Sequence, residues 1–218
     1  MDGVENHVQG TRDSTASQWP IGAITMTSET DALGGRLPLV DPADFTGAQR
    51  QLFDSVTATH HDAGFRITTP DGRPIGPFNA FLLRPEVALK LWEFSSLAQS
   101  QTSLSDRERE VVILAVGAVW DAQFELYAHS ALAQKAGLST ESITTLVSGG
   151  LPDDLSAHEK VAARVAQQLS TRYRIDDELY REAQNTFGAT GLFDIVALIG
   201  VYHSVCAILN LFAVPAPA

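Results

Sequence analysis

The chain has 218 residues, 44% of them hydrophobic and 19% charged, which suits one large domain with a sizeable core. Its formal net charge of −11 repels nucleic acid and anionic membrane surfaces, and we expect neither as a partner. The single cysteine, Cys206, excludes an intramolecular disulfide, and the acidic, polar N-terminus lacks the features of a secretory signal. We therefore expect a cytoplasmic location.

The first part of the chain, residues 1–36, is rich in Ser, Thr, Gly and Asp and has few spaced apolar residues. This composition predicts a flexible tail, followed by a single domain over residues 37–218. Apolar residues then recur at helical spacing from Pro42 to about His60, which predicts an amphipathic helix. The stretch from there to Asn79 is rich in proline and glycine and predicts a loop.

The rest of the chain is predicted to be helical, with clear start and stop signals. Pro85 suits the first turn of a helix that runs to about Gln99. Capping boxes at 105–108 and 156–159 begin two more helices, the first of which carries Glu110. Gly137 ends the helix that carries His129. Since no strand pattern of useful length occurs, the fold class is all-α.

The last of these helices is unusually apolar. Ser139 or Thr140 begins a short helix before it, Asp176 caps another, and Gly188 and Gly191 bracket the turn into the final segment. That segment, residues 191–214, is nearly long enough to cross a bilayer. It contains Asp194, His203 and Asn210, and polar residues are costly inside a membrane. We expect no membrane span but a core helix or a subunit interface.

The most informative stretch is residues 110–129, EVVILAVGAVWDAQFELYAH, because it sets ionisable groups into apolar helical sequence. Buried charge costs several kcal/mol unless it is paired. Glu125 and His129 stand at positions i and i+4, so they share one helix face and the carboxylate can orient the imidazole. This spacing favours an acid/base pair.

Glu110 joins this pair only if the helix breaks. We expect a break at residues 119–121, with Asp121 as the N-cap of the second helix. In an antiparallel hairpin with its pivot there, Glu110 and His129 are equally distant from the turn and face one another. A continuous helix would instead hold Glu110 more than about 20 Å from Glu125.

Three segments carry a family resemblance: GPFNAFLLRPEVA, LSDREREVVILAVGAVWDAQFELYAHSALAQKAGLS and GLFDIVALIGVYHSVCAILNLF. Over roughly residues 75–214 the chain resembles the carboxymuconolactone decarboxylase superfamily, which includes the alkyl hydroperoxidase D-like proteins. The resemblance implies a helical bundle of that type and a homo-oligomer, either a trimer or a hexamer.

Within this superfamily, the peroxidase branch carries Glu, then Cys-x-x-Cys, then His. By position Glu110 and His129 match, but Ala122 and Glu125 stand where the two cysteines belong. Peroxide reduction through a disulfide needs both thiols, so a dithiol peroxidase is disfavoured.

The decarboxylase branch has a glutamate four residues before the histidine, and it is implied to use neither metal nor organic cofactor. The resemblance thus implies a cofactor-independent lyase, a decarboxylase or related isomerase of a small unsaturated or cyclic lactone or keto acid. His129, Glu125 and Glu110 are the predicted catalytic residues, since such a reaction needs proton transfers to carbon.

Two alternatives stay open at this stage, and a third, a metal site, is disfavoured. The same Glu/His set would serve a cyclase or dehydratase in natural-product metabolism that acts on a neutral substrate. A non-catalytic, oligomeric ligand-binding protein would keep the fold without turnover. Glu125 and His129 would also suit a metal ion, but no second such pair occurs, and His60 and His61 have no further ligand at metal-site spacing, so we expect no metal.

Several other side chains are candidates for binding a small-molecule substrate. Phe78 and Asn79, in the loop before Pro85, suit an apolar wall and a polar contact. Trp120, Tyr127 and His203 are predicted either to shape the pocket or to lie in the core. A substrate carboxylate needs a cation, and nothing in the sequence ranks the three candidates Arg66, Arg73 and Arg84.

Overall fold

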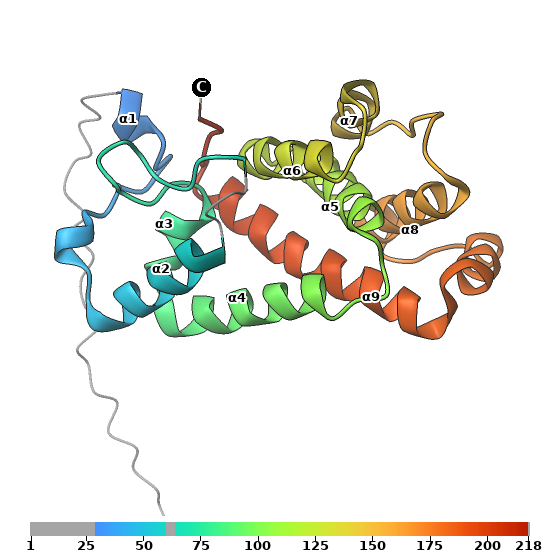
Figure 1. The fold of residues 1–218 in the computed structure, drawn as a ribbon, viewed down its shortest axis with the longest axis horizontal. Helices are drawn as coiled ribbons and strands as arrows, with labels where there is room; N and C mark the ends of the chain where they lie inside the picture. The colour runs from blue at the N-terminus through green and yellow to red at the C-terminus, as the bar shows by residue number, and fades with distance from the viewer. Residues whose placement is uncertain (1–28, 60–63, 218) are drawn as a thin grey trace, which may run out of the picture.

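The computed structural model describes residues 29–59 and 64–217, and these residues form an all-α structure, as predicted (Figure 1). The only β feature among them is an isolated bridge between Thr68 and Pro74. In chain order, the elements are α1 (Glu29–Ala32), the 3-10 helix η1 (Pro42–Asp44), α2 (Gly47–Thr59), α3 (Pro77–Phe81), α4 (Pro85–Ser100), α5 (Asp106–Trp120), α6 (Gln123–Lys135), α7 (Thr140–Val147), α8 (Ala157–Arg172) and α9 (Asp177–Leu211).

The helix starts follow the predicted caps. Ser105 and Ser156 each form a complete capping box, at the starts of α5 and α8. Ser139 caps α7 and Asp176 caps α9 through side-chain bonds to backbone N–H groups. Each cap satisfies amides that the first helical turn leaves without a partner, which is why these short polar residues fix the boundaries.

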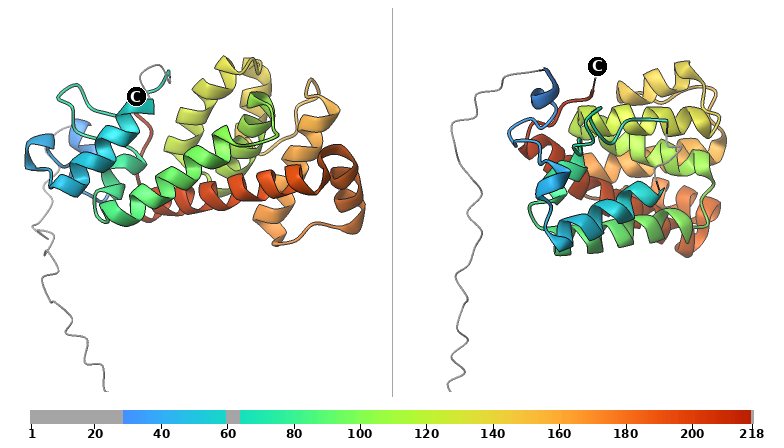
Figure 2. Two further views of the ribbon diagram at one scale, coloured as in Figure 1. Left: turned by 60° about the horizontal axis from the view of Figure 1, so that its bottom comes forward. Right: turned by 60° about the vertical axis from the view of Figure 1, so that its left-hand side comes forward.

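Helix α5 lies at the centre of the fold. It packs against α6, α7, α8 and α9, and all residues from Glu110 to Gly117 are buried. Helix α4 lies alongside α9 on the opposite side of the molecule from α7, and α2 packs on α4 (Figures 1 and 2). A helix buried on every side needs apolar residues all round, and the VVILAVG run of α5 supplies them.

The predicted break between α5 and α6 is confirmed. Helix α5 ends at Trp120, and Asp121 adopts the left-handed conformation with φ of 48°. The prediction that Asp121 is the N-cap of α6 is wrong, because its backbone ends α5 and Ala122 takes the N-cap position. The Asp121 carboxylate instead accepts a hydrogen bond from the Gln123 side chain at 2.7 Å.

Helix α9 is kinked where a turn was predicted. Gly188 has φ of 65° and ψ of −179°, so the helix changes direction there, and glycine tolerates this conformation without strain. By length and composition alone, α9 is able to cross a membrane, a property that it shares with core helices of soluble proteins. Ile195, Leu198 and Leu209 of α9 are completely buried against the other helices, which suits a core helix.

Two boundaries differ from those predicted. Residues 29–36 were assigned to a flexible tail, but residues 29–32 form α1. The turn after α1 contacts the C-terminal segment, where Arg36 N–H donates to the Phe212 carbonyl at 2.7 Å. The other residues of the predicted tail, 1–28, lie outside the described part of the chain. The predicted loop reaches only to Gly76, because Pro77 begins the single-turn helix α3.

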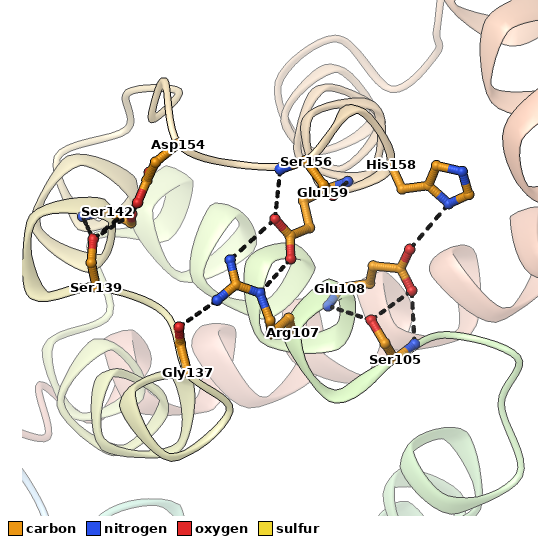
Figure 3. Close-up of polar contacts among 10 residues, drawn as sticks. All are labelled: Ser105, Arg107, Glu108, Gly137, Ser139, Ser142, Asp154, Ser156, His158 and Glu159. Carbon is orange, nitrogen blue, oxygen red and sulfur yellow. Dashed lines mark hydrogen bonds and ion pairs between the residues drawn. The ribbon is translucent and has the colours of Figure 1, made fainter.

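The two capping boxes are joined by an ion pair (Figure 3). Arg107 Nε lies 2.6 Å from Glu159 Oε1, and Arg107 also donates to the Gly137 carbonyl. Burial alone would raise the pKa of Glu159, but the hydrogen bonds from Arg107 and from the Ser156 N–H lower it overall. The pair thus ties the start of α5 to the starts of α8 and α7.

Replacement of Arg107 by Met should destabilise the fold by about 1–2 kcal/mol, because it leaves the buried Glu159 carboxylate without its charge partner and the guanidinium is itself partly exposed. Lys90→Met removes a pair in which both side chains are exposed, and it should cost less than about 0.5 kcal/mol. Urea denaturation of both variants checks this, and equal losses would contradict the proposed role of the ion pair.

Candidate active site

The α5–α6 hairpin brings Glu110 and His129 into contact. Their positions are 19 residues apart, and His129 Nδ1 lies 2.8 Å from Glu110 Oε2 in a buried hydrogen bond. The chain folds this way because the left-handed Asp121 reverses its direction midway between them. The predicted convergence of these two residues is therefore present in the structure.

Glu125 lies on the other side of the same imidazole. Its Oε1 is 3.1 Å from His129 Nε2, one helical turn away. The angle at this contact does not suit a hydrogen bond, and the buried Oε1 atom has no other hydrogen-bond partner among the described residues. Glu110, Glu125 and His129 are each less than 8% exposed, so two carboxylates flank one imidazole out of contact with bulk water.

The three groups shift one another's protonation. Burial raises the pKa of Glu125 to about 7, the charge of His129 opposes the rise, and the charge of Glu110 adds to it. Burial would lower the pKa of His129, but the charges of the two flanking carboxylates and the hydrogen bond that His129 donates to Glu110 raise it to about 9. Near neutral pH the His129 imidazole is therefore charged, and Glu125 is present in both its protonated and its ionised form.

Glu125 and His129 line a cavity of about 770 Å³, whose walls come mainly from α2, α3, α4, α6 and α9. The aromatic residues of the lining are Phe65, Phe78, Phe81, Trp92, Phe124 and Tyr202. A mostly apolar cavity with a few ionisable groups at one point is the usual form of a small-molecule site.

Phe124 is seated in this wall by a close approach of the loop before α3. A Cβ atom at Gly76 would lie 2.3 Å from Phe124 Cζ, and Gly76 has φ of 65°. Only glycine meets both conditions without a shift of the loop. The sequence thus places a glycine where the cavity wall needs backbone in contact with an aromatic ring.

Tyr202 was not predicted as a site residue, yet it contacts the acid/base group. Its ring meets that of His129 edge to face, with centroids 4.9 Å apart. Burial and the charges of Glu125 and Glu110 raise the pKa of its hydroxyl, which a hydrogen bond with Ser95 partly offsets. A signal was present in the last apolar helix, where Tyr202 is followed by Val205, another lining residue, at helical spacing.

Of the predicted substrate-binding residues, the structure places Phe78 in the cavity lining and leaves Asn79 outside it. The Asn79 amide is buried and bonds to backbone: it accepts from Val40 N–H and donates to the Pro38 carbonyl, both at 3.1 Å. Asn79 therefore holds the segment before η1 against α3, and no contact with a ligand in this cavity is supported.

Trp120, Tyr127 and His203 also lie outside the lining. The Tyr127 hydroxyl accepts a hydrogen bond from Arg66 N–H at 3.0 Å. The His203 ring packs edge to face on Trp120, with centroids 5.8 Å apart, and its Nε2 lies 2.8 Å from Ser170 Oγ. These three residues take the packing role that the sequence left open beside the pocket role.

Helix α4 supplies lining residues that sequence reasoning missed. Trp92, Ser95 and Gln99 follow one another at helical spacing along the cavity, and Gln99 Nε2 donates to Ser95 Oγ at 3.1 Å. Their period was visible in the sequence, but only the packing of α4 on α9 shows that this face meets the α6 residues. Ser95 links the row to the buried Tyr202 hydroxyl.

No group of three or more His, Cys, Asp or Glu side chains is arranged to hold a metal ion in the described part of the chain. His60 and His61 lie outside that part. Cys206 is completely buried, and burial, followed by the charge of Glu125, raises the pKa of its thiol. A thiol in this state is a poor nucleophile.

Comparison with known protein families gives one match, which spans the site. Residues 85–168, which include Glu110, Glu125 and His129, match the model of the carboxymuconolactone decarboxylase family. No match was found among curated proteins.

Solved structures share the fold at low sequence identity. An uncharacterized peroxidase-related protein from Ralstonia eutropha, described as an alkylhydroperoxidase AhpD core, is similar over 84% of this chain and 92% of its own, with 14% identity and a TM-score of 0.67. A peroxidase-related protein from a Silicibacter species is 17% identical over 90% of this chain and 96% of its own, with a TM-score of 0.66.

A third similar structure is the debrominase Bmp8 in complex with 2,3,4-tribromopyrrole. Its sequence is 13% identical to this one, and the match covers 88% of this chain and 94% of the debrominase chain with a TM-score of 0.66. At these identities the three structures establish a shared fold, but they do not show that this chain shares their activities.

The raised pKa values predict how stability depends on pH. Glu125 holds its proton more tightly in the folded state, so its contribution to stability is present below the unfolded pKa of 4.5 and is lost as pH rises through about 7. His129 has a raised pKa too, so its contribution is full below 6.5 and is lost as pH rises through about 9. Wild-type stability should fall across both intervals.

Glu125→Gln removes the first of these terms. The variant should be more stable than wild type at pH 8, by roughly 1–3 kcal/mol, and should show no such gain at pH 5. Glu86→Gln, at an exposed position on α4, is the control and should leave the pH dependence unchanged. Urea denaturation at the two pH values tests this, and an unchanged or lower stability of Glu125→Gln at pH 8 would contradict it.

Proposed function

We propose that the chain is an enzyme of the carboxymuconolactone decarboxylase superfamily that moves protons at carbon. The match of residues 85–168 to the model of that family and the alkyl hydroperoxidase D-like fold support this proposal. The reaction class is a cofactor-independent lyase: a decarboxylase, or a closely related isomerase, of a small unsaturated or cyclic lactone or keto acid. The observation that carries this proposal is one buried imidazole, held between two carboxylates at 2.8 and 3.1 Å, that opens on an apolar cavity.

The geometry favours separate roles for the two glutamates. Glu110 is hydrogen-bonded to His129 Nδ1, so it orients the ring and stabilises its charge. Glu125 keeps a buried oxygen without a hydrogen-bond partner, and its pKa of about 7 makes both its acid and its base form available near neutral pH. Glu125 is thus suited to transfer the proton, and His129 to stabilise the charge that develops.

The proposed reaction balances in two steps. First, the bond between the substrate carboxylate and its carbon breaks, carbon dioxide leaves, and the electron pair enters a conjugated enolate, which the His129 imidazolium stabilises. Second, protonated Glu125 donates its proton to the enolate carbon, and solvent later restores that proton. One proton is taken up for each carbon dioxide released. An isomerase would use the same groups to remove a proton from one carbon and return it to another.

A thiol reaction has little support in this chain. The cysteines of the peroxidase branch are replaced by Ala122 and Glu125, and the single thiol, Cys206, is fully buried with a raised pKa. Thiol-dependent peroxide reduction is therefore not part of the proposal. A cyclase or dehydratase that acts on a neutral substrate remains the alternative to the lyase.

We also propose that the chain forms a homo-oligomer, a trimer or hexamer as in relatives of this superfamily. Three large apolar side chains of α9 are exposed, Phe193 by 71%, Val196 by 50% and Leu211 by 62%. Contact with a second copy would remove such a surface from water. We also propose a cytoplasmic location, which fits the lone cysteine.

Carbon dioxide release from a panel of lactone and β-keto acids tests the reaction. Metal-free wild type should release it, and Glu125→Gln and His129→Ala should each lower the rate by about a hundredfold or more. Lys90→Met, on the exposed face of α4, should match wild type. Turnover of neutral substrates without carbon dioxide would support the cyclase or dehydratase, and no turnover with retained ligand binding would support a binding protein.

The pH profile separates the roles of Glu125 and His129. If protonated Glu125 is the proton donor, the rate constant at saturating substrate should fall about tenfold per unit as pH rises above about 7. Deprotonation of His129 should steepen the fall above about 9. A rate that rises through pH 7 would instead assign Glu125 the role of base, and steady-state kinetics across this range distinguishes the two.

A further inference from the structure

One face of α6 lines the cavity, and its side chains change from ionisable to apolar to cationic along the helix. Glu125, His129, Leu132 and Lys135 all line the cavity and follow one another at intervals of three or four residues. With a rise of about 1.5 Å per residue, the Cα atoms of His129 and Lys135 are separated by about 9 Å along the helix axis. This row of side chains begins with a buried acid, Glu125, and ends with a cation, Lys135.

Lys135 is the one lysine or arginine in the cavity lining, and it has no acidic partner among the described residues. Five other basic side chains form ion pairs with carboxylates: Arg73, Lys90, Arg107, Arg109 and Arg164. No ion pair or hydrogen bond of the Lys135 ammonium occurs among the described residues. Of the arginines considered for a substrate carboxylate, none lines the cavity, and Arg73 is bound to Asp31 and Asp71.

The side chain of Lys135 lies close to Gly64. A Cβ atom at Gly64 would lie 3.1 Å from Lys135 Cε and 3.9 Å from Ala131 Cβ. Lys135 is exposed, so its ammonium group is in contact with solvent while its side chain lines the cavity. Lysine commonly lays its methylene groups along an apolar surface and keeps its charge in water.

The charges at the two ends of the cavity favour one orientation of a bound acid, with its carboxylate at the lysine end. At the buried end, Glu110 and Glu125 flank His129, so an anion that binds there meets two acidic side chains. At the other end the lysine stands without an acidic partner, on a protein of net charge −11 that repels anions at long range. Between the ends, Leu132 and the aromatic walls favour an apolar body.

Resting on the proposed function, we propose that Lys135 binds a carboxylate that does not react, at one end of an elongated and otherwise apolar substrate. The reacting carbon lies at Glu125 and His129, about 9 Å along α6 from the lysine. Lys135 is thus a residue that determines specificity, and the substrate class is an apolar acid longer than a single ring. A decarboxylase substrate of this class carries a second carboxylate, which is the one that leaves.

Direct binding of a simple probe tests this assignment without any turnover. Hexanoate, octanoate, decanoate and octanamide are titrated into wild type, Lys135→Met, Lys135→Arg, Lys90→Met and His129→Ala, with calorimetry or Trp fluorescence as the readout. The best-binding carboxylate should lose about tenfold in affinity in Lys135→Met, equivalent to about 1.4 kcal/mol. It should keep its affinity in Lys135→Arg, Lys90→Met and His129→Ala, and octanamide should bind equally to all the variants.

Two results would overturn the proposal, and a third would separate it from the proposed reaction. Equal losses for octanoate and octanamide in Lys135→Met would show a packing effect rather than recognition of charge. A loss in His129→Ala with none in Lys135→Met would place the carboxylate at the acid/base group. Carboxylate binding that depends on Lys135, in a protein that releases no carbon dioxide from any acid, would uphold the anion site while the proposed reaction fails.

Discussion

The hydrogen bond between Glu110 Oε2 and His129 Nδ1 fixes the rest of the site, because a buried imidazolium is tolerable only beside a buried carboxylate. That bond requires the chain to reverse between α5 and α6, and the left-handed Asp121 provides the reversal. It also requires apolar cover on every side of the hairpin, which α8, α9 and the aromatic residues of α3 and α4 provide. The helices thus bury one ion pair between a carboxylate and an imidazolium beside an apolar cavity.

The site contains a third ionisable group, Glu125. Unlike Glu110, it forms no hydrogen bond with His129. Its Oε1 atom is buried without a hydrogen bond, and burial raises the pKa to about 7. An unsatisfied buried acid costs stability, and such costs are common where a protein does chemistry. This contrast between a satisfied and an unsatisfied glutamate on either side of one histidine is the reason that the proposed reaction gives Glu110 the orienting role and Glu125 the reactive one.

Most of the fold could be predicted from the sequence, since capping boxes, helix-stopping glycines and helical periods are local signals. The pairing of Glu110 with His129 was also accessible, because equal distance from the α5–α6 turn is a property of position along the chain. Of the cavity walls, Phe78 was predicted from the sequence, but most of the other lining residues were not. Asn79 was assigned to the pocket but holds Val40 and Pro38, whereas Tyr202 and Lys135 were passed over. Which helix faces meet, and which cations lack partners, depends on tertiary contacts between residues far apart in sequence.

The same hairpin has a consequence for the order in which the molecule folds. Glu110 and His129 are only 19 residues apart, and one tight reversal between two helices brings them together, so their contact has a low contact order. The last helix, by contrast, supplies Tyr202 from more than 70 positions further along the chain. Closure of a short loop is much faster than assembly of distant elements. We therefore expect the Glu110 carboxylate and the His129 imidazole to meet early in folding, while water still surrounds them, so that the two groups are buried as a pair.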